Sequence, residues 1–364
     1  MKVGDVLSVL EQWAPLQYQE SYDNAGLITG KRSWQLTAAL ITLDCTEEVV
    51  QEAIDKGANL IIAHHPIVFR GLKKLNGEGY VERTIIKAIK ADVAIYAIHT
   101  NLDNVSTGVT PKIADLLGLT NQRVLAPKSG TLSKLVTFVP TENTQEVLDA
   151  LYKAGAGSIG NYDHCSFEVQ GKGTFRPNEL ANPHIGQSNQ EEFVSESRIE
   201  VVFPSHIHGS VIAALKVAHP YEEVAYYVTA LENSNQEVGA GRIGDLAAPM
   251  NTQAFMGMVK DKLKVACIRH TTIHANEVKR IAVCGGSGSF LLRKAISSKA
   301  DVFITADFKY HEFFDADGKI IIADVGHYES EQFTKDLLYS HLIEKITNIA
   351  VHLSEVDTNP IKYY

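Results

Sequence analysis

The sequence has few cysteines, and their spacing forms neither a metal site nor a disulfide framework. Only four occur among 364 residues, and no two are separated by the short interval of a thiolate zinc site. Scattered thiols are typical of the reducing cytoplasm, so a cytoplasmic protein with reduced cysteines is predicted. The four positions are Cys45, Cys165, Cys267 and Cys284.

Long apolar runs and an excess of positive charge are also missing. No apolar stretch approaches the roughly 20 residues that a membrane helix needs. The first segment, MKVGDVLSVLEQWAP, is interrupted by acidic residues, which a signal peptide would not contain. The formal charge of −9 argues against a broad surface for the phosphates of nucleic acid. We therefore expect neither a membrane nor a nucleic acid as a partner.

The composition is that of a globular protein with a raised number of histidines. Hydrophobic residues make up 45% of the chain and charged residues 21%, which is ordinary for a folded domain. The length allows two domains, or one domain with an insertion. The 14 histidines are the main departure from an ordinary composition, and several of them follow apolar runs.

The first third of the chain alternates short apolar runs with amphipathic stretches. A strand at Leu36–Leu43 precedes the helical stretch TEEVVQEAIDKGA, in which Thr46 is placed as an N-cap. A strand at Asn59–Ala63, a helix at Tyr80–Lys90 and the strand DVAIYAI, which ends at His99, follow. This alternation predicts a mainly parallel sheet with helices on its faces.

The last third repeats the pattern. A strand at Arg280–Val283 leads through CGGSGS into a helix, and the strand DVFITA ends at Asp307; a further helix and the strand KIIIAD follow. The segments KGANLIIAHH, KADVAIYAIH and SKADVFITAD share one design, an apolar strand that ends in an ionisable side chain. We predict two related α/β halves.

The middle of the chain has a different order of elements. Residues 136–231 alternate as β-α-β-β-α-β, the order of a ferredoxin-like module. The polar stretches LAPKSGTLSK and ENSNQEVGAGRIG on either side are predicted to be linkers. The expected architecture is an α/β domain of residues 1–130 and 237–364, split by an inserted α+β domain of residues 131–236.

Ionisable side chains gather where the predicted strands end. In open α/β sheets, ligands bind outside the carboxyl ends of the strands, so these residues are candidates for a site. They are Asp44, His64, His65, His99, Asp103, Asp307 and His327.

The stretch GHYESE suggests a metal ligand pair. On a helix, His327 and Glu331 would project from the same face because they are four residues apart. With His64, His65 and Asp103 they give three imidazoles and two carboxylates, more than a four-coordinate zinc site uses. A carboxylate bridging two divalent ions would use them better. Such ligands suit Zn, Mn, Fe, Co or Ni, and the sequence does not choose among these.

Structural explanations exist for each of these residues alone. His99 is more simply a hydrogen-bonded core histidine, and Asp103 could cap a turn. His327 and Glu331 could be a surface pair on a helix. The adjacent His64–His65 pair favours a metal site, because neighbouring strand residues point in opposite directions and both rings would need partners.

Three other polar segments could bind a ligand. The CGGSGS loop could cradle a phosphate with its backbone amides, although tight-turn geometry also explains its glycines. Lys309, beside Asp307 and His311, is a candidate contact for an anion. The stretch His219–Glu223 could bind a metal, but a helix-to-strand connection is the preferred interpretation. The residues of the proposed substrate site are Gly285, Gly286, Ser287 and Lys309.

Several motifs together resemble one family, the NIF-three-like dinuclear-metal proteins, also known as GTP cyclohydrolase 1 type 2 homologues. The motifs are YDNAGL, IIAHHP, HTNLD, GAGRIG, CGGSG and GHYESE, in this order along the whole chain. The middle region, with GTFRP and AHPYEEVAYYV, is similar to the PII-like or CutA-like domain of the longer bacterial members.

The resemblance implies a site of two divalent metal ions and a toroidal homohexamer with its metal sites facing an internal cavity. The implied ligands are the residues that the spacing had already singled out: His64, His65, Asp103, His327 and Glu331. None of these five positions departs from the family pattern.

The first functional hypothesis is a hydrolase of a nucleotide-type substrate, by resemblance a GTP cyclohydrolase, that uses a metal-bridged hydroxide. His99 or Asp44 could orient the ligands or move protons. The second is a metal- or nucleotide-responsive binding or regulatory protein with little turnover. The third is a structural metalloprotein whose ions stabilise assembly.

Overall fold

The structure is a computed structural model that describes residues 1–364. The chain forms two compact units. The first, here called the α/β unit, consists of Met1–Pro127 and Glu237–Tyr364. The second, here called the central unit, is Lys128–Gln236. Each is described separately below.

The first half of the α/β unit is built on a five-stranded sheet with the order β1-β4-β3-β2-β15. Four of its strands are parallel, and β1 runs antiparallel to β4 at one edge. Their residues are almost entirely buried, as expected for a sheet with helices on both faces. The strands are β1 (Gly26–Thr29), β2 (Ala38–Thr42), β3 (Leu60–Ala63), β4 (Ala94–Ala97) and β15 (Ala350–Leu353).

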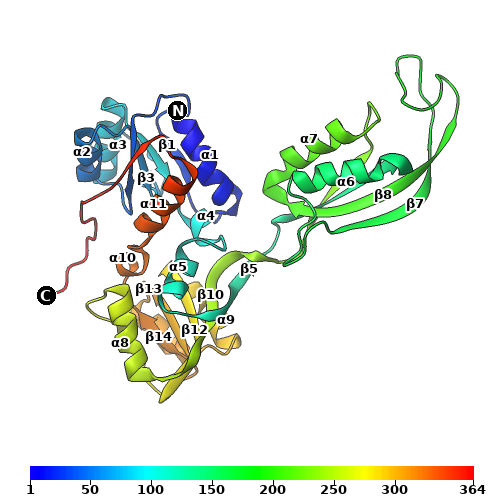
Figure 1. Cartoon of the computed structure of the whole chain (residues 1–364). Helices are drawn as coiled ribbons and strands as arrows, with labels where there is room; N and C mark the ends of the chain where they lie inside the picture. The colour runs from blue at the N-terminus through cyan, green and yellow to red at the C-terminus, as the bar shows by residue number, and fades with distance from the viewer. The chain divides into compact units, whose positions relative to one another are not determined.

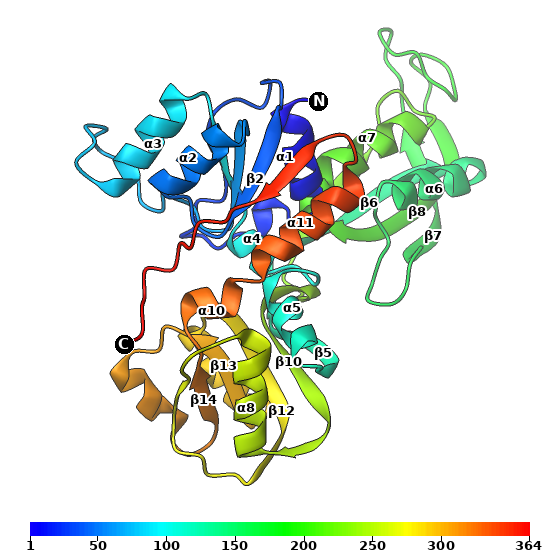
Figure 2. The same ribbon diagram turned by 60° about the vertical axis from the view of Figure 1, so that its left-hand side comes forward.

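Helices cover both faces of this sheet, as Figures 1 and 2 show. Apolar side chains of α2 and α3 pack on one face, and those of α1 and α11 pack on the other. Thr46 caps α2 as predicted, because its side chain accepts a hydrogen bond from the amide of Val49. The helices are α1 (Val3–Trp13), η1 (Leu16–Tyr18), α2 (Glu47–Asp55), α3 (Tyr80–Lys90), α4 (Thr100–Asp103), α5 (Val109–Leu116) and α11 (Thr334–Lys345).

The second half of the α/β unit has a six-stranded sheet with the order β11-β14-β13-β12-β10-β5. Its three central strands β12, β13 and β14 are parallel. The strands are β5 (Thr120–Lys128), β10 (Asn235–Asn251), β11 (Arg269–His270), β12 (Glu277–Ser287), β13 (Val302–Ala306) and β14 (Ile321–Asp324). The helices are α8 (Thr252–Leu263), η4 (Ser289–Leu291), α9 (Leu292–Ser297), η5 (Tyr310–Ala316) and α10 (His327–Glu331).

The mixed α/β class predicted from the sequence is confirmed, and one apolar core joins the two halves of the α/β unit. Buried side chains of α1 and α11 from the first half belong to the same cluster as side chains of α8 and β12 to β14 from the second. Helix α9 covers the opposite face of the second sheet. The helix predicted before β14 is the 3-10 helix η5.

The two stretches predicted to be linkers contain the boundaries between the two units, but most of their residues belong to strands. LAPK belongs to β5, and NQEVGAGRIG belongs to β10. The glycines of β10 are there because the neighbouring backbone lies very close: a Cβ at Gly239 would be 2.2 Å from the carbonyl oxygen of Ala126. At Gly241 a Cβ would be 2.8 Å from the side chain of Leu291. Close packing, rather than flexibility, explains this glycine-rich segment.

The central unit is a four-stranded antiparallel sheet with the order β7-β8-β6-β9. Both of its long helices lie on one face of the sheet (Figure 1), where they bury Leu135, Ile199 and Phe203. The elements are β6 (Leu132–Pro140), η2 (Thr141–Asn143), α6 (Thr144–Lys153), β7 (Ser166–Phe175), β8 (Glu192–Pro204), η3 (Ser205–Ile207), α7 (His208–Ala218) and β9 (Tyr226–Leu231). His219–Glu223 is the connection between α7 and β9, as preferred from the sequence.

None of the helices is long and apolar enough to span a membrane.

Candidate metal centre

The histidine pair follows the fully buried strand β3, which fixes both rings. His64 is completely buried, and its Nδ1 lies 2.8 Å from the carbonyl oxygen of Ile98. Nδ1 of His65 lies 2.8 Å from Oδ1 of Asp44. Since a neutral ring that donates from Nδ1 presents a lone pair on Nε2, both residues offer Nε2 as a ligand.

Helix α10 supplies the second pair of ligands. The helix begins at His327, directly after Gly326, whose φ of 93° favours glycine. His327 and Glu331 project from one face, with Nε2 of the histidine 3.1 Å from Oε2 of the glutamate. Nδ1 of His327 lies 2.7 Å from Oδ2 of Asp307, so Nε2 again faces the site.

Asp103 lies at the end of the short helix α4, which follows β4. Its Oδ1 is 3.7 Å from Nε2 of His64. His99 stands just before this helix, and its ring centroid is 5.4 Å from the ring centroids of His64 and of His65. Nδ1 of His99 lies 2.7 Å from Oδ1 of Asp23.

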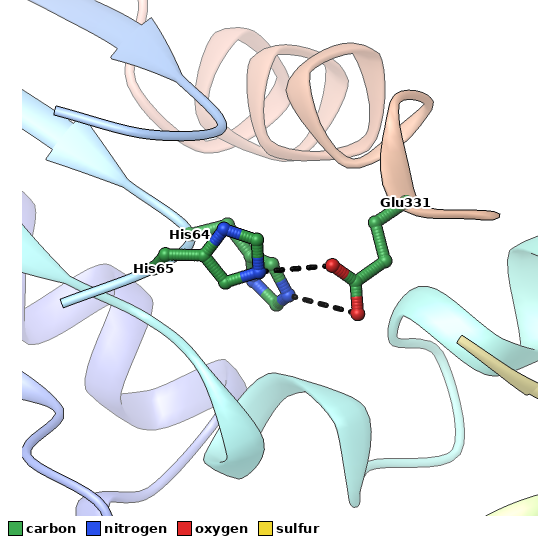
Figure 3. Close-up of side chains that lie close together, drawn as sticks. All are labelled: His64, His65 and Glu331. Carbon is green, nitrogen blue, oxygen red and sulfur yellow. Dashed lines mark hydrogen bonds and ion pairs between the residues drawn. The ribbon is translucent and has the colours of Figure 1, made fainter. Parts of the chain in front are cut away.

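Ligand atoms from the two halves of the α/β unit converge on Glu331 (Figure 3). Oε2 is 2.9 Å from Nε2 of His65, and Oε1 is 3.8 Å from Nε2 of His64. Ligand atoms of these three residues all lie within 4.8 Å of one another. Nε2 of His327 is 3.3 Å from Nε2 of His65. All five predicted ligands therefore surround one point, with Asp103 reaching it beside His64.

Burial and mutual charge perturb the pKa values at this centre. Burial alone would raise the pKa of Glu331, but the imidazoles around it, His327 foremost, hold it well below its usual range. Burial would likewise lower the pKa of His65, but hydrogen bonds with Asp44 and Glu331 raise it to about 9. The pKa of His327 rises to about 11 despite burial, chiefly through the charge of Glu331. Desolvation and the charge of Glu331 raise the pKa of Asp103 to about 6.

Two buried polar atoms at the centre have no hydrogen-bond partner: Nε2 of His64 and Oδ1 of Asp103. Leaving such an atom unsatisfied costs about 1–3 kcal/mol. A divalent cation between them would satisfy both, and imidazole nitrogen with carboxylate oxygen is a donor set that such ions accept. The residues present therefore fit a metal site.

The glycine loop that was considered for phosphate binding packs against the metal ligands instead. The amide of Gly285 donates to the hydroxyl of Thr110, and the amide of Gly286 donates to that of Ser330. Gly286 has a φ of 60°, and a Cβ there would be 2.4 Å from Oε1 of Glu331. The loop thus leaves room for the carboxylate of Glu331 and is itself held in place by side chains.

A cavity of about 650 Å³ opens over the centre. Asp44, His99, Gly285 and Ser287 are among the residues that line it, whereas Gly286 and Lys309 are not. No lysine or arginine lines it.

Two contributions to the site were not anticipated from the sequence. Asp23 accepts hydrogen bonds from His99 and Thr100, although it comes from a loop far away in the chain. Thr358 of the C-terminal segment donates to Oδ2 of Asp44 at 2.8 Å. The YDNAGL motif was a signal for Asp23, while nothing in the local sequence marks Thr358.

Comparison with known proteins identifies the family of this chain. The family model described as Duf34/NIF3 (NGG1p interacting factor 3) matches residues 1–360. A relative from Halalkalibacterium halodurans is 40% identical over 372 residues, covering 100% of both chains. One from Bacillus subtilis is 39% identical over 364 residues, covering 98% of this chain and 97% of the relative. Both are named GTP cyclohydrolase 1 type 2 homolog.

A solved structure of a NIF3-related protein is also similar to this chain. The crystal structure of a Bacillus cereus protein related to NIF3 is 39% identical and superimposes with a TM-score of 0.88. The match covers 100% of this chain and 99% of that one. The family resemblance seen in the motifs is therefore confirmed: the chain belongs to the Duf34/NIF3 family.

Proposed function

We propose that this chain is a dinuclear-metal-dependent hydrolase of a nucleotide-type substrate. The observation that carries the proposal is the convergence of imidazole nitrogens and carboxylate oxygens, two of them buried without a hydrogen-bond partner. Four of the five predicted ligands also line one cavity: His65, Asp103, His327 and Glu331. The relatives' names, GTP cyclohydrolase 1 type 2 homolog, support the reaction class.

The proposed metal ligands are His64, His65, Asp103, His327 and Glu331. Glu331 is suited to bridge two ions, because Oε1 faces His64 while Oε2 faces His65 and His327. Divalent Zn, Mn, Fe, Co or Ni all accept this donor set. When bound, such ions would lower the pKa of a coordinated water toward neutrality and so supply a nucleophile.

His99 is the proposed proton carrier. Its Nδ1 is held by Asp23, so its Nε2 is the nitrogen free to exchange a proton with a group in the cavity. Asp44 has a different task, since its Oδ1 orients His65 and its Oδ2 accepts from Thr358. We assign Asp44 to positioning and His99 to acid–base chemistry.

The cavity walls favour the ring of the substrate over its phosphates. Tyr22, Phe69 and Phe290 line the opening, and the ring centroids of Tyr22 and Phe69 are 6.2 Å apart. Aromatic side chains offer stacking surfaces to a base. With no lysine or arginine on the walls, a triphosphate would find neither of these phosphate-binding side chains there. Gly285 and Ser287 line the cavity and stay candidates for substrate contact, whereas Gly286 and Lys309, which do not line it, are candidates only for a remote phosphate.

The central unit is proposed to be an inserted ferredoxin-like domain, spanning about the predicted residues 131–236. Its β-α-β-β-α-β order and its antiparallel strand order β7-β8-β6-β9 support this assignment. We further propose a cytoplasmic toroidal homohexamer, which the family resemblance implies; light scattering in solution tests the assembly.

The alternative function is a metal- or nucleotide-responsive binding protein with little turnover. A second cavity, lined only by residues of the central unit, favours this alternative.

The test is metal content followed by turnover. Metal ions per chain are counted, and hydrolysis of GTP, GMP, guanosine and simple phosphoesters is then measured. The wild type is compared with the double variant His65→Ala, Glu331→Ala. The matched control is His274→Ala, Glu277→Ala, which removes the same residue types at exposed positions outside the cavity.

We expect about two ions per chain in the wild type and the control, and loss of both metal and hydrolysis in the double variant. If metal-loaded wild type and double variant are equally inert on every substrate, the hydrolase proposal fails. The binding alternative then stands if a nucleotide still binds.

A further inference from the structure

The central unit contains its own cavity of about 620 Å³, within the range of about 300–1,000 Å³ typical of small-molecule sites. The cavity lies on the sheet face opposite α6 and α7. Phe138 and Glu196 line it, whereas their neighbours Val139 and Ser197 point to the helix side. We propose that this cavity binds a small organic cation, an amine or amidine carried on a flat apolar framework, with Glu196 as its charge partner.

Glu196 is the deepest charged group of this cavity. The residue is only 8% exposed. Its Oε1 accepts a hydrogen bond from the Tyr221 hydroxyl at 3.0 Å, and no lysine, arginine or histidine forms an ion pair with it. A buried carboxylate without a cationic partner is costly, so a cation that enters the cavity would be strongly favoured beside it.

The backbone opposite Glu196 is shaped to receive this carboxylate. A Cβ at Gly173 would be 2.1 Å from Oε2 of Glu196. Gly171, two residues earlier on β7 and therefore on the same face, is paired with Glu196 across the sheet. Two glycines in the middle of a strand weaken it, and here Gly173 makes the room that the carboxylate of Glu196 occupies.

Aromatic rings form another part of the wall. The ring centroid of Tyr221 is 5.7 Å from that of Phe175 and 6.4 Å from that of His184. Phe138 and Tyr227, whose ring centroids are 6.2 Å apart, line the cavity from β6 and β9. The faces of such rings attract cations, and this attraction strengthens when the cation is desolvated.

The basic side chains of the lining do not neutralise Glu196. Arg198 is 50% exposed, and its Nη2 pairs with Oε1 of Glu200 at 2.7 Å. The ammonium of Lys172 lies over the ring of Phe193, 4.1 Å from the centroid. Arg176 is exposed.

Two further acidic residues line the same cavity. Glu222 accepts a hydrogen bond from the amide of Asn182, which fastens the β7–β8 loop to the α7–β9 connection, and Glu223 follows it. The cavity thus presents one buried carboxylate and ring faces, whereas the lysine and arginines of its lining are exposed. Cations and amidines match this arrangement better than anions do.

The test uses the full chain and three probes of one shape. Benzamidine is cationic, benzamide is its neutral analogue and benzoate is anionic. Binding is measured by calorimetric titration and by ligand-observed NMR. We expect benzamidine to bind at least about tenfold more tightly than benzamide, and benzoate not to bind. Glu196→Gln should weaken benzamidine by about tenfold or more.

Glu168→Gln is the matched control, because it removes a carboxylate from the same sheet at an exposed position outside the cavity. It should leave benzamidine binding unchanged. Benzoate binding as tight as benzamidine, no benzamidine binding up to about 10 mM, or equal binding by Glu196→Gln would each overturn the proposal. If Glu196→Gln does not fold, the order of the three probes on the wild type decides alone.

Discussion

At the residue scale, the metal centre depends on which nitrogen each imidazole presents. In His64, His65 and His327 the Nδ1 atom is held by a carbonyl or carboxylate oxygen, so each ring turns its Nε2 to the centre. These oxygen partners orient three histidines from two parts of the chain toward one point. Their removal should therefore affect metal binding even though they touch no ion.

The first prediction concerns Asp307, which orients His327. Asp307→Asn keeps the shape of the side chain and suits the left-handed backbone at this position, where φ is 61°. It removes the charge that holds Nδ1 of His327, so metal affinity should fall by about 10- to 100-fold. Competition with a chelator of known affinity measures the change.

Asp317→Asn is the control for this prediction. Asp317 also has a positive φ, 47°, but it is exposed and pairs with Lys319. Its substitution should leave metal affinity at the wild-type value. An Asp307→Asn variant that binds metal as tightly as this control would show that Asp307 does not support His327.

A second prediction concerns Asp23 and acid stability. Burial alone would raise the pKa of Asp23, but hydrogen bonds with His99 and Thr100 lower it from 3.8 to about 2. A carboxyl with a depressed pKa stabilises the fold above its unfolded value, and this contribution is lost as the pH falls through the folded value. The wild type should lose about 2 kcal/mol from this group between those two pH values.

Urea unfolding across the acid range measures this effect. Asp23→Asn should be less stable than the wild type at neutral pH, and its stability should change less over the acid window. Asp55→Asn, at an exposed carboxyl, should follow the wild-type curve. Equal steepness of the wild-type and Asp23→Asn curves would contradict the assignment.

At the element scale, the site residues that follow strands could be predicted from the sequence. The apolar runs before His64 and His99 end at one edge of the five-stranded sheet, because parallel strands share a direction. Those before Asp307 and His327 end at one edge of the six-stranded sheet for the same reason. Asp23 and Thr358 could not be found in this way. They reach the site from segments outside the strands and helices. The positions of these segments depend on tertiary packing, which the order of strands and helices does not predict.

At the element scale, the glycine-rich segments are where the sequence suggested a different role from the one that the structure shows. The glycines of β10 resemble a linker in sequence, but they allow the backbone of Ala126 to approach. The CGGSGS loop resembles a phosphate cradle, but its amides bond to Thr110 and Ser330. A glycine in the sequence indicates that space is needed at its position, but it does not identify the neighbouring group that takes up this space.

Gly286→Ala is the prediction that follows. A Cβ there would meet Oε1 of Glu331 at 2.4 Å, so the carboxylate must shift and metal binding should weaken by at least about tenfold. Gly318→Ala is the control, because its φ of 65° resembles the 60° of Gly286 while a Cβ at Gly318 meets nothing within 4 Å. Both variants bear similar backbone strain, and only the first should lose metal. Equal metal loss in both variants would show that backbone strain, and not the contact with Glu331, weakens metal binding.

At the scale of the whole molecule, the metal centre connects the two halves of the α/β unit. His64, His65 and Asp103 come from the first half, and His327 and Glu331 follow β14 of the second. The apolar core that runs through both halves already joins them, so a bound ion adds a second link at the sheet edges. Removing the ion should therefore lower the stability of the α/β unit as a whole.

Chelation tests this link. An ion that binds only the folded chain at about 100 times its Kd adds about 2.7 kcal/mol. For a unit of this size, that corresponds to a rise in Tm of roughly 5–10 °C. Calorimetry should show this rise for metal-loaded over chelated wild type, while Glu331→Gln melts at one temperature in both states. Glu277→Gln, at an exposed position, should keep the wild-type difference. A metal-independent Tm in the wild type would mean that the ions do not stabilise the junction of the two halves.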